Sequence, residues 1–416
     1  AKAGMSPNSW VIGCSIHRSM NRGINLVSTI SVTIRNNVLF DIQGNGVNLD
    51  YGYEMYNIIE DNCVVLTHSC THCMNNDVHP GSFWLANPLQ NFVGNAAAGS
   101  DGDGIRFALF SSSDYRLIVG GQLSTVSSVN PYRLGIEAFF DNSAHSNRYG
   151  NGISMDPQWQ PYYAATYPMS TTATSSNAPV VLSDFSGFKN GNKGVYTKFN
   201  GMITYEGFNI SSTGATDSNA AGFWCEDINA NLNMSAGINN SVFVAYTSNT
   251  PNRDRRDDRV GINLPNNDNF FVSDVSFINY HDENWAVEPN KLQDRNSLLE
   301  EWGWQYIFEG INYIDSEQKI KMNFMHQAIF HDLDGTLTDN ASTADFQLVP
   351  YSPLYNLSHC TNLTNSNWST PYPVMVCDPD YRIRRLSGSI SNSYTLADGT
   401  TTSTSTSSKS KEVFHT

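Results

Sequence analysis

The sequence predicts an all-β protein: a parallel β-helix with loop insertions, one short helix and an extended C-terminal segment. Two motifs, one centred on glycine and one on asparagine, recur at matching intervals, and the composition suits strands. Only 15% of the 416 residues are charged, whereas Asn, Ser, Thr, Gly and Tyr are abundant. This composition is typical of a β-rich extracellular protein rather than a helical cytosolic enzyme.

The glycine motif marks the coils. Successive central glycines lie 23, 58 and 48 residues apart, which fits coils of about 23 to 24 residues with one insertion. Its copies are NRGINL (21–26), GNGVNL (44–49), GDGIRF (102–107), GNGISM (150–155) and the looser GNKGVY (191–196). A coil of this length lays short strands on separate faces and cannot bury its own apolar side, so stability has to come from stacking.

The asparagine motif moves with the glycine motif. Asn37, Asn95 and Asn142 each occupy the centre of a short β-type segment, with intervals of 58 and 47 residues. Because the intervals between copies of the two motifs change in parallel, we expect Gly and Asn at equivalent corners of successive coils.

We expect the β-helix to occupy residues 1–336. A small disulfide-containing, glycosylated extension follows over 337–385, and a Ser/Thr-rich extended tail over 386–416. Within the β-helix, loops are expected near 67–84, 156–179 and 251–259. KLQDRNSLLEEWGWQYIF, near 291–308, has the spacing of an amphipathic helix.

Several phrases resemble the β-helix region shared by fibrocystin, fibrocystin-like proteins and the cell-migration-inducing (transmembrane) hyaluronidases. They are GNGVNLDYGYEMYNIIEDN, SFWLANPLQNFVGNAAAGSDGDGIRFAL, FFDNSAHSNRYGNGI and IFHDLDGTLT, within roughly 11–336. The resemblance implies a right-handed β-helix of pectin-lyase type, exposed at a cell or ciliary surface. The glycine-rich β domain that precedes this region in the family does not precede it here, which weakens any transfer of activity.

The stretch FHDLDGTLTD (330–339) matches the first motif of a haloacid-dehalogenase phosphatase. That enzyme needs the motif after the first strand of a doubly wound domain, with further motifs over the next hundred or more residues, and only 81 residues follow Gly335. We therefore interpret Asp332 and Asp334 as capping groups of a β-turn, with Gly335 in the left-handed conformation. The family resemblance agrees, since an Asp-x-Asp-Gly phrase closes its β-helix region. A Ca²⁺ site at the two carboxylates is the alternative; no other cofactor is expected.

THSCTHCMNNDVHPGSFW (67–84) concentrates potential metal ligands in one loop: His68, Cys70, His72, Cys73, Asp77 and His79. The spacing is zinc-like, but the second ligand pair usually comes from a distant segment. A plain loop, or a disulfide involving Cys63, Cys70 or Cys73, is the preferred interpretation. With seven cysteines, at least one must be free, liganded or paired to another chain, and the partners of Cys14, Cys63, Cys70, Cys73 and Cys225 stay open. Cys360 and Cys377 bracket a 16-residue loop and are predicted to pair.

An enzyme on this fold would be a polysaccharide hydrolase or lyase, which needs carboxylates, or a carboxylate and a base, facing one groove. Asp101, Asp103 and Arg106 share one corner. Glu137, Asp141, His145 and Arg148 share another. Because such residues also decorate solvated corners, no catalytic residue is assigned from the sequence.

Seven Asn-x-Ser/Thr sequons are candidate N-glycosylation sites: Asn209, Asn233, Asn239, Asn340, Asn356, Asn362 and Asn367. Four of them lie in one 28-residue span, 340–367, that follows the Asp-x-Asp-Gly motif. The tail LADGTTTSTSTSSKSKEVFHT has a disordered composition, and O-linked sugars, a partner or a neighbouring subunit would be needed to order it.

The formal charge of −15 argues against nucleic acid or anionic membrane as a partner, and no apolar run is long enough to span a membrane. The chain opens without Met or a signal peptide, which indicates a processed product or part of something longer. We expect an extracellular or ciliary-surface location.

The function expected from these observations is that of a structural glycoprotein. Its tail would dock on another copy or on another extracellular protein, giving a filament-forming or partner-docking subunit. The alternatives are a polysaccharide-active enzyme and a glycan-binding module.

Overall fold

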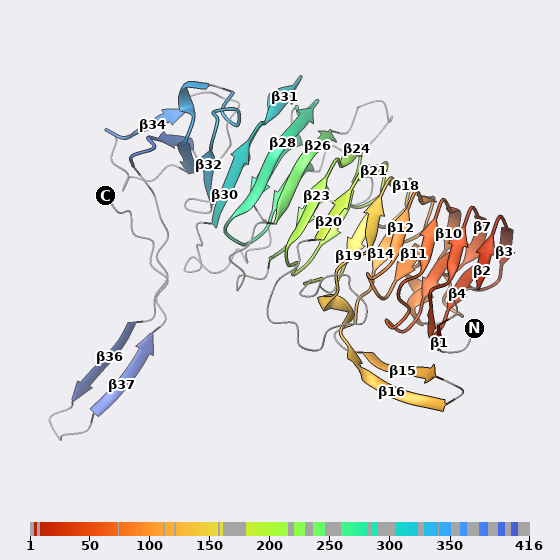
Figure 1. Ribbon diagram of the computed structural model, residues 1–416. Helices are drawn as coiled ribbons and strands as arrows, with labels where there is room; N and C mark the ends of the chain where they lie inside the picture. The colour runs from red at the N-terminus through yellow and green to blue at the C-terminus, as the bar shows by residue number, and fades with distance from the viewer. Residues whose placement is uncertain are drawn as a thin grey trace.

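The computed structural model forms a long stack of β-coils, with the N-terminal coils at one end and a small antiparallel unit beside the last coils (Figure 1). The structure describes residues 4–5, 9–73, 75–110, 113–119, 122–156, 159–160, 180–214, 220–228, 236–245, 259–281, 284–289, 304–322, 328–339, 341–350, 358–363, 374–381, 390–395 and 401–406. The predicted parallel β-helix is confirmed, because nearly every strand of the stack pairs in parallel with the strand of the next coil.

One face of the stack is a nine-stranded parallel sheet. Its strands are β4 (Ile24–Leu26), β8 (Val47–Leu49), β11 (Gly81–Leu85), β14 (Asp103–Phe107), β19 (Ile153–Met155), β22 (Val195–Thr197), β25 (Ala221–Cys225), β27 (Arg259–Leu264) and β29 (Asn284–Pro289). The glycine motif found in the sequence begins strands of this sheet.

A second face begins as a five-stranded sheet: β2 (Trp10–Ile12), β6 (Thr33–Arg35), β9 (Ile58–Glu60), β12 (Asn91–Val93) and β17 (Ala138–Phe140). The third face runs through β3 (Ser15–Ser19), β7 (Val38–Gln43), β10 (Cys63–His68), β13 (Ala96–Ala98), β18 (Asn142–His145), β21 (Phe185–Phe188), β24 (Asn209–Ser211) and β31 (Asn312–Ile314). In the later coils the second and third faces belong to one continuous sheet. Its further strands are β20 (Val180–Ser183), β23 (Ile203–Glu206), β26 (Gly237–Val244), β28 (Phe270–Ile278), β30 (Trp304–Glu309) and β32 (Ala328–Asp332).

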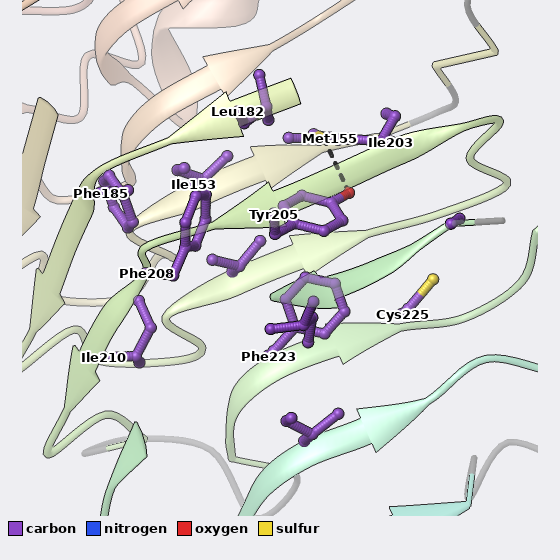
Figure 2. Packing of buried hydrophobic residues seen from close by; sticks show 14 of the residues in the cluster. Ile153, Met155, Leu182, Phe185, Ile203, Tyr205, Phe208, Ile210, Phe223 and Cys225 are labelled. Atoms are coloured by element: carbon purple, nitrogen blue, oxygen red, sulfur yellow. Dashed lines mark hydrogen bonds between the residues drawn. The ribbon is translucent and has the colours of Figure 1, made fainter. Parts of the chain in front are cut away.

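Inward side chains of the three faces meet in one continuous apolar core. Figure 2 shows its middle, where Phe185, Phe208, Tyr205 and Phe223 lie at aromatic contact distance between the sheets. The Tyr205 hydroxyl, fully enclosed, contacts the Met155 sulfur at 3.8 Å. Stacked aromatic rings contribute stabilisation beyond the area that they bury.

A buried asparagine ladder accounts for the second sequence motif. The side-chain amides of Asn37, Asn62 and Asn95 donate to the carbonyl oxygen of the next asparagine, ending at Asn142, at 2.9, 3.0 and 3.3 Å. The same oxygens also accept the main-chain N–H of the preceding asparagine. The ladder therefore satisfies buried polar groups at a corner where no strand can. Asn62 is a rung that the spacing of the motif did not reveal.

Stacked glycines account for the first motif. A Cβ on Gly104 would lie 2.9 Å from the Gly152 carbonyl oxygen, and one on Gly152 would lie 2.5 Å from that of Gly194. The requirement here is close approach of neighbouring coils rather than an unusual backbone angle.

Two hairpins lie outside the three faces. β15 (Ser113–Val119) and β16 (Gln122–Val129) project from the stack, an insertion that the sequence analysis missed (Figure 1). β36 (Ile390–Thr395) and β37 (Thr401–Thr406), within the C-terminal tail, form the other. The pair β1 (Gly4–Met5) and β5 (Thr29–Ile30) is parallel.

The helix predicted near 291–308 is wrong over its last five residues. Residues 304–308 belong to β30, which pairs in parallel with β28 and β32, so strand stacking overrides the local helical pattern. The remainder of that segment, 291–303, lies outside the described residues, as do nearly all of the loops expected at 156–179 and 251–259. The described part of the chain contains three 3₁₀ turns, η1 (Asn75–Val78), η2 (Pro131–Arg133) and η3 (Ala341–Thr343), and no helix that could cross a membrane.

Beside the last coils, an antiparallel unit joins β33 (Phe346–Pro350), β34 (Cys360–Leu363) and β35 (Val374–Cys377) to β32. The predicted Cys360–Cys377 pair forms a disulfide between β34 and β35. Its sulfurs belong to a separate small apolar cluster with Ile329, Val349 and Met375.

Replacing both Cys360 and Cys377 by Ser should lower the stability of this antiparallel unit by about 3 kcal/mol, because a disulfide across a loop of this length restricts the unfolded chain. Hydrogen exchange of β33–β35 measures the loss. Exchange in β8 and β11, at the other end of the stack, serves as the internal control. Unchanged exchange in β33–β35 would contradict the expectation.

Candidate functional site

A pocket of about 390 Å³ lies on the outer face of the nine-stranded sheet. β14, β19, β22 and β25 contribute its floor, and the segments just before and after them contribute its rim. The lining residues are His79, Asp101, Gly102, Asp103, Arg106, Tyr149, Gly150, Asn151, Ser154, Asp156, Asn192, Lys193, Tyr196, Trp224 and Glu226.

Strand register assembles the floor. Arg106, Ser154, Tyr196 and Trp224 are opposite one another on four successive strands. Neighbouring strands of a sheet lie about 4.8 Å apart and alternate residues share a face, so these side chains form a row across the sheet. Trp84 extends the row on β11.

A second row follows two positions later along the same strands. Met155, Thr197 and Cys225 are in register, so the next residues, Asp156, Lys198 and Glu226, follow the ends of β19, β22 and β25 together. The Glu226 carboxylate accepts a hydrogen bond from the Tyr196 hydroxyl at 2.5 Å and lies 3.6 Å from the Lys198 ammonium. Burial and the hydrogen bond to Glu226 raise the pKa of Tyr196 far above its ordinary value. Tyr196 is therefore a neutral hydrogen-bond donor at physiological pH.

Both cations of the pocket are already engaged. Arg106 donates to Asp103 at 2.9 Å, and its guanidinium lies over the Trp84 ring, 5.1 Å from the centroid. Lys193 donates to the Asn192 amide oxygen at 2.7 Å, and its ammonium lies 4.9 Å from the centroid of the Trp224 ring. These contacts position the two indoles through cation–π attraction.

Two N–H donors of lining residues have no acceptor among the described residues: the indole N–H of Trp224 and the Nε–H of Arg106. Trp224 is only 3% exposed, and a buried donor without an acceptor costs about 1 to 3 kcal/mol. Their placement beside the pocket fits a ligand, or ordered water, that supplies oxygen acceptors.

Asp227, next to Glu226, makes the folding stability depend on pH. Burial, supplemented by the neighbouring charge of Glu226, raises the pKa of Asp227 from 3.8 to about 6. Between pH 4 and 6 the folded protein thus binds more protons than the unfolded chain, so folding stability should fall as pH rises through this window. Asp227→Asn should remove that slope and stabilise the protein at pH 7 by about 1 kcal/mol, after allowance for partial solvent exposure. Urea unfolding at pH 4, 5, 6 and 7 tests this, and an identical slope in the variant would contradict it.

One of the two predicted carboxylate corners lines the pocket. Asp101, Asp103 and Arg106 belong to it, as inferred from their shared corner. Glu137, Asp141, His145 and Arg148 do not line it. Glu137 and Asp141 are exposed, His145 stacks on Phe188 at 4.3 Å, and Arg148 covers the ring of Tyr149. Sequence reasoning missed Tyr196, Trp224, Glu226 and Asp156, which register alone brings to the first corner.

The Cys/His loop contains a disulfide and several ion pairs. Cys70 and Cys73 form a disulfide, which removes the two thiolates of the zinc-like spacing. Asp77 is buried and paired with Arg22 at 3.1 Å. His68 lies between Asp41 and Asp101, at 3.2 and 3.6 Å. No group of three metal-ligating side chains occurs in the part of the chain that the structure describes.

The remaining thiols differ in accessibility: Cys14 is exposed, Cys63 half-buried and Cys225 buried. Burial raises the pKa of the Cys225 thiol to about 12, so this cysteine behaves as an unreactive core group.

The Asp-x-Asp-Gly phrase is a turn, as interpreted from the sequence. Asp332 is fully buried and accepts hydrogen bonds from the backbone of Gly335, Leu337 and Thr338. Asp334 accepts from Thr336 and from the Gly310 N–H, and Gly335 has a φ of +81°. β32 lies within the β-helix, which excludes the doubly wound setting of a phosphatase. Both carboxylates thus accept protein hydrogen bonds, and a Ca²⁺ site there stays the alternative interpretation.

Three of the seven predicted glycosylation sites lie in described residues. Asn209 on β24 and Asn362 on β34 are exposed, and Asn239 on β26 is half-exposed. Asn233, Asn340, Asn356 and Asn367 lie outside them. Glycosylation of all seven stays a prediction.

Comparison with known proteins confirms the resemblance inferred from the sequence. The CEMIP beta-helix family matches residues 1–152. Mouse (Mus musculus) fibrocystin-L is 27% identical over 387 residues, which cover 91% of this chain but 8% of that protein. Human (Homo sapiens) cell surface hyaluronidase CEMIP2 is 31% identical over 170 residues, 35% of this chain and 12% of that protein. This chain therefore spans only about a tenth of the length of these relatives.

Among solved structures, the Azotobacter vinelandii mannuronan C-5 epimerase AlgE4 A-module aligns over 78% of this chain and 81% of its own. The sequence identity is 13% and the TM-score 0.30.

Proposed function

We propose that this chain is the rigid β-helical part of an extracellular protein and that it binds carbohydrate in the pocket on its nine-stranded sheet. The pocket carries the proposal. It places two aromatic rings, amides, carboxylates and unpaired N–H donors on one flat row of strands. Extended ligands are held by few directional polar groups on a largely preformed surface, and such a row provides them.

The relatives and the composition support an extracellular setting. One similar protein is by name a cell surface hyaluronidase, and two disulfides occur in the described residues, as expected of an oxidising compartment. The stacked coils supply the stiffness, because every coil is fixed by both neighbours.

Affinity electrophoresis through gels that contain single polysaccharides tests the binding. Tyr196→Phe keeps the ring and removes the hydroxyl, and Trp224→Phe keeps an aromatic ring and removes the indole N–H of the floor. Retardation of the native chain that weakens in both variants is the expected result. Asn312→Ala, on the third face, is the matched control. Equal mobility of all proteins with every polysaccharide would overturn the proposal.

The same samples report on catalysis, because carboxylates line the pocket. Release of new reducing ends would identify a hydrolase, and release of unsaturated sugars a lyase. Binding without either product identifies a glycan-binding module.

A docking role for the tail is the second candidate function. β36 and β37 form an isolated two-stranded sheet, and such a hairpin is marginally stable by itself in water. A second copy or another extracellular protein that adds a strand would stabilise it. Sedimentation of the full chain and of a chain ending at residue 385 measures this role; indistinguishable monomers would contradict it.

A further inference from the structure

We infer that the pocket selects uncharged sugar units and rejects polyuronates and other anionic polymers. The inference rests on the proposed carbohydrate binding and specifies its ligand class. Three features carry it: the balance of charge, the prior engagement of the cations, and the pairing of free donors with free acceptors.

The lining carries an excess of negative charge. Four carboxylates, Asp101, Asp103, Asp156 and Glu226, face the pocket against the two permanent cations Arg106 and Lys193. Even with Lys198 counted beside Glu226, the carboxylates remain in excess. The whole chain carries −15, so its long-range field also repels polyanions.

The cations cannot serve an incoming carboxylate without losing existing contacts. Arg106 already pairs with Asp103, whose other oxygen accepts two hydrogen bonds from Asn151. Lys193 is 6% exposed, on the indole of Trp224. A uronate would have to displace Asp103 or draw the buried Lys193 from its ring, and either change leaves a charge poorly compensated.

The free groups match hydroxyls instead. The Asp156 carboxylate has no hydrogen-bond or ion-pair partner among the described residues, and it lies one strand from Tyr196, whose pKa its charge helps to raise. A carboxylate accepts hydrogen bonds and donates none. The indole N–H of Trp224, which lines the pocket, donates and accepts none. A sugar hydroxyl both donates and accepts, so hydroxyls along an uncharged polymer can satisfy both Asp156 and the Trp224 indole.

The test compares charge classes on the native chain. Affinity electrophoresis at low and moderate salt is run with a mixed-linkage β-glucan and a galactomannan as neutral probes, and with hyaluronan and polygalacturonate as anionic probes. Retardation by at least one neutral polymer, with no effect of salt and none from either polyanion, is expected. Tighter binding of hyaluronan or polygalacturonate, weakened by salt, would overturn the inference while leaving carbohydrate binding intact. Binding of neither class would remove the proposed function itself.

Two single-charge variants sharpen the result. Asp156→Asn should weaken binding of the neutral polymer about tenfold, because it replaces a charged acceptor, while retaining the fold. Glu137→Gln removes the same charge from an exposed site outside the pocket and should change nothing. Equal affinities for both variants and the native chain would overturn the role of Asp156.

Discussion

Gly152→Ala is expected to destabilise the protein by about 3 kcal/mol or more, although it adds a single methyl group. The new Cβ would lie 2.5 Å from the Gly194 carbonyl oxygen and 2.8 Å from the Asn190 amide nitrogen. Neither can move away freely. Gly194 is itself stacked on Gly222, and the Asn190 side chain is bonded to Asn147 and to the Ala144 carbonyl. The midpoint of urea unfolding, followed by tryptophan fluorescence, measures the loss.

Gly13→Asn is the matched control for that substitution. Gly13 has a φ of +65°, but a Cβ there would meet no atom within 4 Å, and asparagine tolerates the left-handed conformation. Its cost should stay below about 1 kcal/mol. If Gly152→Ala unfolds no earlier than Gly13→Asn, close stacking of glycines is not what the repeated motif provides.

Asn95→Leu should cost about 4 kcal/mol, because it leaves polar groups buried without partners. The Asn95 side-chain oxygen accepts from the main-chain N–H and the amide of Asn62, and its amide donates to Ile59, Val93 and Asn142. Leucine fills similar space and makes none of these bonds. The same urea unfolding measurement applies.

Asn95→Asp separates polarity from hydrogen bonding. It restores an acceptor for Asn62 but directs a second oxygen toward the carbonyls of Ile59 and Val93, so it should not rescue stability at pH 7. Asn312→Ala, at an exposed position with one 3.4 Å hydrogen bond, should stay within about 0.5 kcal/mol of the native chain. An Asn95→Leu protein as stable as Asn312→Ala would show that the ladder contributes nothing.

The repeated elements of the fold could be predicted from the sequence because each coil needs a particular residue type at a fixed position. Gly46, Gly104 and Gly152 recur where neighbouring coils leave no room for a Cβ. Asn37, Asn95 and Asn142 recur where a corner needs an amide. The strand at residues 304–308 was misread as helix because its apolar residues also fit a helical period, and only pairing with β28 and β32 decides the conformation.

Only part of the candidate site could be predicted from the sequence, for a different reason. Asp101, Asp103 and Arg106 lie within six residues of one another in the sequence. Tyr196 and Trp224 instead come from later coils, whose lengths differ because of insertions. Local spacing cannot say that positions 106, 154, 196 and 224 are opposite one another. The hairpin β15–β16 is one of the insertions that hides this register.

Under mechanical load, the sequence spacing of the asparagine ladder determines how far the protein lengthens when each coil unfolds. Its rungs are separated by 25, 33 and 47 residues, although each rung adds one strand spacing to the folded rod. If the rod is pulled along its axis and peels coil by coil, these segments would lengthen it by about 85, 110 and 160 Å at full extension. A force–extension trace would thus contain steps of unequal size, and each size would identify the coil that had just come away.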